Sequence, residues 1–108
     1  MDSAPTDILA RLAATIAGRA SADPATSYVA RLHAKGLAKI AQKVGEEAVE
    51  CAIAAVSADA AALTAEAADL IFHLLVLLQA RDVPLAAVLA ELDRREGIGG
   101  LAEKAGRL

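Results

Sequence analysis

Two neighbouring stretches decide the fold: residues 37–56, LAKIAQKVGEEAVECAIAAV, and residues 60–79, AAALTAEAADLIFHLLVLLQ. Neither contains proline, and both are rich in alanine, the strongest helix former. In the first stretch, the apolar side chains expected to supply much of one helix face are Ile40, Val44, Val49, Ile53 and Val56. We predict two long helices, over 37–56 and from Asp59 to about Gln79, joined by a turn at 57–59 in which Asp59 caps the second helix.

Three shorter helices are predicted on either side of this pair. The first runs roughly from Pro5 to Ala17, and the second is capped by Thr26 or Ser27 and ends near Gly36. The last starts around 82–84 and ends near Gly97, because proline is tolerated in the first turn of a helix. The predicted fold class is therefore all-α, a single domain over 1–108 built as a bundle of four to five helices.

The composition supports a helical fold with apolar surface to spare. Of the 108 residues, 56% are hydrophobic, only 2% are aromatic and 29 are alanine. A β-sandwich would need more β-branched and aromatic residues, and a disordered chain would hold fewer apolar ones. So small a domain has little interior volume, so we expect part of this surface to be buried in a homodimer. The run at 70–78, apolar nearly all round, is the best candidate for the dimer core.

Charge and cysteine content narrow the class of partner and the compartment. The net charge is −3, from 11 basic and 14 acidic residues, so nucleic acid is not expected as a partner. The N-terminal residues lack the pattern of a signal peptide, and the apolar run at 70–78 is too short to span a bilayer. The single cysteine, Cys51, is expected to be a small core thiol and fits a reducing compartment. These features predict a soluble cytoplasmic protein that does not bind membranes.

Two acidic motifs lie on the two long helices at matching depth. Glu46, Glu47 and Glu50 form an E-E-x-x-E pattern, and Glu66 and Asp69 form E-x-x-D. Counted from the turn, Glu50 and Glu66 lie eight and seven residues away, and the outer pair lies eleven and ten residues away. If the helices are antiparallel, these carboxylates face one another, which needs a positive charge between them. An all-oxygen cluster favours Mg²⁺, with Mn²⁺ as a second candidate.

Basic residues precede the first acidic motif at four-residue intervals, at Arg31, Lys35, Lys39 and Lys43. They can form surface salt bridges on the helix, or they can hold the phosphates of a substrate, and the spacing alone does not decide between the two. Arg94 and Arg95 form a second basic group near the end of the last helix.

Two histidines are harder to assign from the sequence. His73 lies four residues after Asp69 and is expected to be a buried histidine bonded to a backbone carbonyl, although it can also contact a carboxylate. His33 is expected on the surface.

These motifs resemble a known family. The Ser27-Tyr28 pair, the run KGLAKIAQKVGEEAVE at 35–50, the segment EAADL at 66–70 followed by His73, and the segment LAELDRR at 89–95 resemble phosphoribosyl-ATP pyrophosphohydrolases. The resemblance is strongest over 27–96 and leaves out the first helix. Phe72 stands where the family often has tyrosine. The sequence has neither the length nor the cysteine cluster of the cyclohydrolase to which this domain is sometimes fused, so we expect the stand-alone form.

The resemblance implies a function and a role for each site residue. The expected reaction is Mg²⁺-dependent hydrolysis of phosphoribosyl-ATP to phosphoribosyl-AMP and pyrophosphate, the second step of histidine biosynthesis, by a homodimer with its sites close to the interface. It implies that four residues ligate the metal: Glu47, Glu50, Glu66 and Asp69. Glu46 is the expected catalytic residue that orients or deprotonates water. The residues expected to bind the substrate are Lys35, Lys39, Lys43, Arg94 and Arg95.

Three alternatives remain open at this point. One is a house-cleaning nucleoside triphosphate pyrophosphohydrolase of the same superfamily. Another is a di-iron carboxylate bundle, which would need Glu-x-x-His pairs that neither acidic motif offers. The third is a non-catalytic helical assembly module, which predicts no binding of Mg²⁺.

Overall fold

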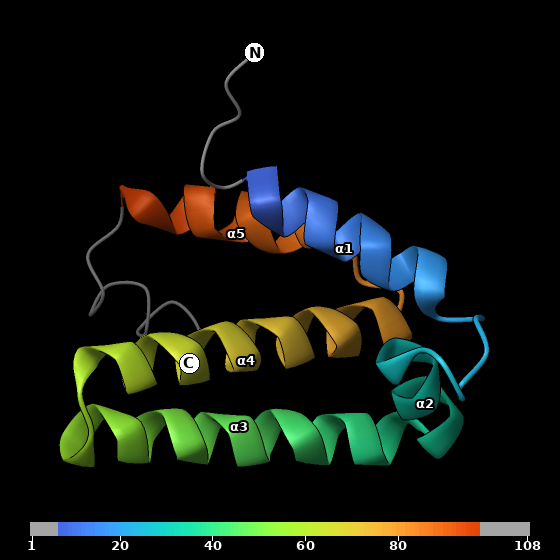
Figure 1. Cartoon of the computed structure of the whole chain (residues 1–108). Coiled ribbons are helices and arrows are strands. Elements are labelled where there is room, and N and C mark those ends of the chain that lie inside the picture. Colours follow the sequence, from blue (N-terminus) through green and yellow to red (C-terminus); the bar gives the residue numbers. More distant parts are fainter. Residues whose placement is uncertain (1–6, 98–108) are drawn as a thin grey trace.

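Over residues 7–97, which the structure describes, the chain folds into five α-helices and contains no strand. In the computed structural model the helices are α1 (Asp7–Arg19), α2 (Tyr28–Lys35), α3 (Leu37–Ser57), α4 (Ala60–Ala80) and α5 (Leu85–Glu96) (Figure 1). The predicted all-α class is confirmed. The predicted start of the first helix, Pro5, lies outside the described residues, and that helix ends two residues later than predicted, at Arg19.

The two long helices form an antiparallel pair joined by a very short turn. In Figure 1, α3 and α4 lie side by side along their whole length, with the turn at one end and α2 at the other. Ala58 takes an extended conformation after α3, and the Asp59 carboxylate accepts a hydrogen bond of 2.9 Å from the N–H of Ala62. The predicted cap is therefore in place, and it fixes where α4 begins relative to the end of α3.

The caps of the shorter helices also follow from the sequence. Ser27 caps α2, its hydroxyl accepting a bond of 3.1 Å from Ala30 N–H. Gly36 separates α2 from α3 with a φ of 96°, a conformation in which residues with a Cβ are strained. Pro84 stands just before α5 rather than in its first turn, and its carbonyl accepts from Ala87 N–H at 3.0 Å.

A small core forms where α1 and α2 pack against the α3–α4 pair. Its buried members are Ile16, Val29, Leu32, Ile40, Leu75 and Val76. Each of the first four helices contributes to this set, whereas α5 adds only the partly buried Leu85. In Figure 1, α5 lies on the same side of α4 as α1, away from α3. The core therefore lies at the end of the α3–α4 pair that is next to α2.

The expected apolar face of α3 is in fact two faces. Ile40 is buried against α4, whereas Val49, Ile53 and Val56 are 57%, 56% and 87% exposed. The prediction that these residues share one face is wrong, because Ile40 and Val49 are nine residues apart, and 100° per residue places them on opposite sides of a helix.

The structure also leaves part of α4 uncovered. Ile71 and Leu74, which belong to the apolar run predicted for the dimer core, are 44% and 40% exposed in the single protomer. The protomer therefore leaves apolar surface uncovered on both long helices.

By length and composition alone, α4 could cross a membrane, a test that the core helix of a soluble protein also passes. In this structure the helix carries Glu66, Asp69 and His73 in its middle and packs along α3. Acidic side chains in the middle of a membrane span are costly, so the polar side of α4 does not fit a lipid environment.

Candidate functional site

Four carboxylates meet between α3 and α4. Oxygens of Glu47, Glu50 and Glu66 lie within 4.8 Å of one another, and a second group within the same distance joins Glu47 to Asp69 and His73. We call Glu47, Glu50, Glu66 and Asp69 the acidic cluster. The matching depth predicted from the turn brings these side chains together, as expected for antiparallel helices with 1.5 Å of rise per residue.

The acidic cluster contains buried oxygens that no group within residues 7–97 satisfies. Glu47 is 4% exposed, and its Oε2 has no hydrogen-bond partner among the described residues; the same holds for Oε2 of the half-buried Glu66. Leaving a buried carboxylate oxygen unpaired costs free energy. Glu50 and Asp69 are exposed and keep the cluster open to solvent. The donor set therefore fits a hard divalent cation that retains some of its water.

The electrostatics of Glu47 and Glu50 are linked. Burial by itself raises the pKa of Glu47. Hydrogen bonds with Lys43, Glu50 and Asp69 together lower this pKa by more, so the net shift is downward. The negative charge of Glu47 in turn raises the pKa of Glu50, with smaller contributions from their hydrogen bond and from Glu66. Glu50 is thus harder to ionise beside the charge of Glu47, and a bound cation would relieve this repulsion.

Lys43 is the basic residue that reaches the acidic cluster. Its Nζ lies 3.2 Å from Glu47 Oε1 and 3.7 Å from Glu46 Oε1. The hydrogen bond with Glu47 is the main reason that the pKa of Lys43 is raised. Lys43 therefore stays charged beside the cluster, as both interpretations of the basic series require. Lys35 and Lys39 are exposed, one at the end of α2 and one in the first turn of α3.

Glu46 stands next to the cluster but outside both groups of close oxygens. It is exposed and accepts a hydrogen bond of 2.8 Å from Gln42 Nε2, which is the main cause of its lowered pKa. Glu46 lies four residues before Glu50, so the two occupy the same edge of α3. It is an ionised carboxylate beside the cluster with access to water.

His73 is buried and fully engaged. Its Nδ1 lies 2.8 Å from the carbonyl oxygen of Asp69, which can only accept, so Nδ1 carries the proton. Its Nε2 is then an acceptor and receives the Tyr28 hydroxyl at 2.9 Å. The predicted backbone contact is confirmed, and the Asp69 carboxylate is also near, with Oδ1 3.7 Å from Nδ1.

Tyr28 is the site residue whose role the sequence did not reveal. It lies 45 residues from His73, on α2, and its ring centre is 6.1 Å from that of Phe72. No short-range spacing connects residues so far apart; only the packing of α2 against α4 brings them together. His33, expected on the surface, is instead half-buried, and its Nε2 has no hydrogen-bond partner within residues 7–97. This correction follows from the same packing of α2. Cys51 is half-buried and free.

The structure does not bring Arg94 and Arg95 to the acidic cluster within one chain. Both guanidiniums bind Glu91 on α5: Arg94 through two bonds of 2.8 and 3.0 Å, and Arg95 through one of 2.9 Å. In Figure 1, α5 lies across α4 from α3, which carries Glu47 and Glu50. Their role in binding substrate stays a prediction.

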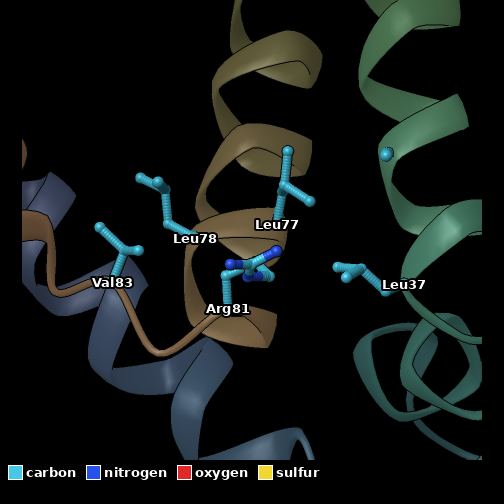
Figure 2. A pocket seen from close by; sticks show the side chains of 6 residues that line it. Leu37, Leu77, Leu78, Arg81 and Val83 are labelled. Carbon is cyan, nitrogen blue, oxygen red and sulfur yellow. The ribbon is translucent and has the colours of Figure 1, made fainter.

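An apolar cavity of about 380 Å³ lies between the start of α3 and the end of α4. Figure 2 shows Arg81 between Leu37 on one side and Val83 on the other, with Leu77 and Leu78 above. None of the acidic cluster lines it. Its lining offers one charged group, so it does not form part of the carboxylate site.

Comparison with known proteins identifies related chains. Residues 9–96 match the family model described as phosphoribosyl-ATP pyrophosphohydrolase. A phosphoribosyl-ATP pyrophosphatase of Novosphingobium aromaticivorans is 68% identical over 94% of this chain and 94% of its own length. The enzymes of that name from Rhizorhabdus wittichii and Erythrobacter litoralis are 65% and 68% identical, over 94% and 92% of this chain and 96% and 95% of their own lengths. The match includes most of α1, which the sequence motifs did not reach.

Proposed function

The chain belongs to the phosphoribosyl-ATP pyrophosphohydrolase family, and from this membership we propose that it hydrolyses phosphoribosyl-ATP to phosphoribosyl-AMP and pyrophosphate. The reaction adds water across a phosphoric anhydride and serves histidine biosynthesis. The observation that carries the proposal is the acidic cluster, in which two buried oxygens, on Glu47 and Glu66, have no partner among the described residues.

The acidic cluster would hold Mg²⁺, with Mn²⁺ as a substitute. Glu47, Glu50, Glu66 and Asp69 offer oxygen ligands from two helices, the donor type that these hard cations prefer. When bound, the cation supplies positive charge that polarises a phosphoryl oxygen and offsets the charge developing on the leaving pyrophosphate. In this assignment His73 holds Asp69 in place through its backbone carbonyl and is not itself a ligand.

Lysines beside the cluster bind the phosphates. Lys43 is close enough to Glu46 and Glu47 to neutralise charge at the site, and Lys39 and Lys35 extend the positive charge towards α2. An ammonium acts on phosphate as a point charge, without a fixed geometry. Arg94 and Arg95 are proposed to bind more distant parts of the substrate.

Glu46 orients or deprotonates the attacking water. It is an exposed, ionised carboxylate on the same edge of α3 as Glu50, and the hydrogen bond from Gln42 fixes its position. As the water oxygen bonds to a phosphorus of the anhydride, the proton that water loses passes to Oε1 or Oε2 of Glu46. The bond from that phosphorus to the bridging oxygen breaks, and pyrophosphate is released.

The active unit is proposed to be a homodimer in the cytoplasm. The exposed apolar side chains of α3 and α4, among them Ile53, Ile71 and Leu74, border the helix pair that carries the acidic cluster. Covering them with a second copy would bury apolar surface next to the site.

The Glu50→Gln variant tests the metal site. We expect it to lose Mg²⁺-dependent pyrophosphate release by a factor of about 100 or more, because a neutral amide replaces a charged ligand. Since Glu50 is exposed, the helical circular dichroism spectrum and the melting temperature should change little. Glu96→Gln, the same chemical change at an exposed position on α5, is the matched control and should keep full activity.

Near-normal turnover by Glu50→Gln would contradict the metal assignment. A panel of substrates tests the reaction itself: preference for dCTP or dUTP over phosphoribosyl-ATP would favour the house-cleaning alternative. Growth of a histidine auxotroph that lacks this step, when supplied with the wild-type gene, would support the assignment in cells.

A further inference from the structure

A second cavity borders the candidate active site, at the junction of α1, α2 and α4. It has a volume of about 420 Å³. Five of its lining residues offer a charge, a hydroxyl or an aromatic face: Arg19, Thr26, Ser27, Tyr28 and Phe72. None of its lining residues is acidic, in a chain whose net charge is −3. The cavity therefore carries a positive charge and two aromatic rings, in contrast to the net negative charge of the whole chain.

Tyr28 is shared by this cavity and the acidic cluster. On one side its hydroxyl binds His73, a ring nitrogen of which lies within 4.8 Å of carboxylate oxygens of Glu47 and Asp69. On the other side Tyr28, a residue that is 44% exposed, places its ring against Phe72 and lines the cavity. Tyr28 thus connects the two places: it lines the cavity and, through His73, contacts the edge of the acidic cluster.

Several groups at the cavity are free to bind an anion. Arg19 is exposed at the end of α1 and makes no ion pair within residues 7–97. Ser27 is buried, its oxygen accepts from Ala30 N–H, and its own proton has no acceptor in the same range. The N–H groups of Tyr28 and Val29, in the first turn of α2, also lack a partner there. Guanidinium, hydroxyl and amide donors together match a phosphate monoester.

We propose that this cavity binds the phosphoribosyl group of the substrate, with Arg19 on its phosphate and the ring of Tyr28 beside the adenine. The proposal rests on the proposed function. The order of the groups along the substrate is triphosphate, ribose, adenine and phosphoribosyl. The order along the protein is the same: the acidic cluster with Lys43, the Tyr28 and Phe72 rings, and Arg19. Aromatic faces bind bases by stacking.

The inference assigns substrate choice to this cavity. ATP and the deoxynucleoside triphosphates carry the groups that reach the acidic cluster and Tyr28 but have nothing to place against Arg19. A site that pairs its donors with a phosphate disfavours a ligand that leaves them unpaired. Arg19 thereby distinguishes phosphoribosyl-ATP from the substrates of a general nucleotide hydrolase.

The Arg19→Ala variant tests this assignment, with Arg11→Ala as the matched control, since Arg11 is exposed on the same helix two turns earlier and does not line the cavity. For Arg19→Ala we expect KM for phosphoribosyl-ATP to rise about tenfold or more, with kcat within about threefold, because a charge-assisted contact to phosphate is lost. Arg19→Lys should restore part of the affinity. Arg11→Ala should leave both constants unchanged.

Calorimetric binding of phosphoribosyl-AMP and of AMP separates the two halves of the ligand. We expect wild type to bind phosphoribosyl-AMP at least about tenfold more tightly than AMP, and Arg19→Ala to lose this difference without weakening AMP. Ribose 5-phosphate and inorganic phosphate, added as competitors, show whether the sugar or the phosphate alone is recognised; competition by the sugar phosphate supports the inference.

Two results would overturn the inference. Equal loss of affinity for AMP and phosphoribosyl-AMP in Arg19→Ala would show a general effect of charge, as would an equal loss in Arg11→Ala. Competition by inorganic phosphate as strong as that by ribose 5-phosphate would exclude recognition of the sugar. Failure of the proposed function is distinguishable, because wild type would then fail to hydrolyse phosphoribosyl-ATP in the first place.

Discussion

At the scale of single residues, the site combines what the sequence predicts with what only packing provides. The acidic cluster follows from helix periodicity and from the distance of each carboxylate to one turn. The contact between Tyr28 and His73 does not, because it joins α2 to α4 across 45 residues. It matters since it fixes the ring of His73, whose Nδ1 holds the carbonyl of Asp69.

The Tyr28→Phe variant tests this contact. Removing the hydroxyl leaves the buried Nε2 of His73 without a donor, which we expect to lower the free energy of unfolding by about 1 kcal/mol. Urea denaturation measures the change, and a second measurement of pyrophosphate release should show a modest loss of activity from a less firmly held Asp69. Unchanged stability would mean that water replaces the hydroxyl at no cost.

At the scale of elements, helix boundaries were predictable and helix faces were not. Helix ends depend on local capping chemistry, which can be recognised in the sequence itself, as at Asp59, Ser27 and Gly36. Which apolar side chains turn inward depends on where the neighbours lie, and for α3 the prediction joined Ile40 and Val49, which lie on opposite sides. The buried face is harder to predict for alanine-rich helices, because small apolar side chains are found on both the buried and the exposed face.

The last helix carries an ion-paired group with its own pH dependence. Hydrogen bonds from Arg94 and then Arg95 lower the pKa of Glu91 from 4.5 to about 2. Because the folded pKa is the lower one, the stabilisation is present above pH 4.5 and is lost as the pH falls towards 2. We therefore expect Glu91→Gln to melt below wild type at pH 6, and the two melting curves to converge near pH 2.

Thermal melts at several pH values, followed by circular dichroism, measure this difference. Asp93→Asn, a like change on the same helix, serves as control and should show no such convergence. Since Glu91 is half-exposed, added salt should shrink the gap at pH 6. A gap that is independent of pH would contradict the assignment.

At the scale of the whole molecule, the exposed side of α3 predicts association. We expect Ile53→Asp, at a position 56% exposed in the protomer, to convert dimers into monomers while the helical content stays the same, because a charge would be buried between two copies. Light scattering after size-exclusion chromatography measures the mass. Thr15→Asp, at an exposed site on α1, is the control, and a monomeric wild type would contradict the prediction.

The two-residue connection between α3 and α4 has a consequence for how this chain can vary. The distance of each carboxylate from this turn decides whether the side chains of α3 and α4 meet. An insertion of one residue between Glu50 and Ser57 would therefore shift Glu47 and Glu50 by about 1.5 Å along the axis of α3 and rotate them by about 100° around it. The length of the loop before α2 does not set the position of any carboxylate of the acidic cluster. Changes in length should therefore be tolerated around 20–26 and forbidden along the hairpin, a pattern that deep mutational scanning with single-codon insertions would reveal.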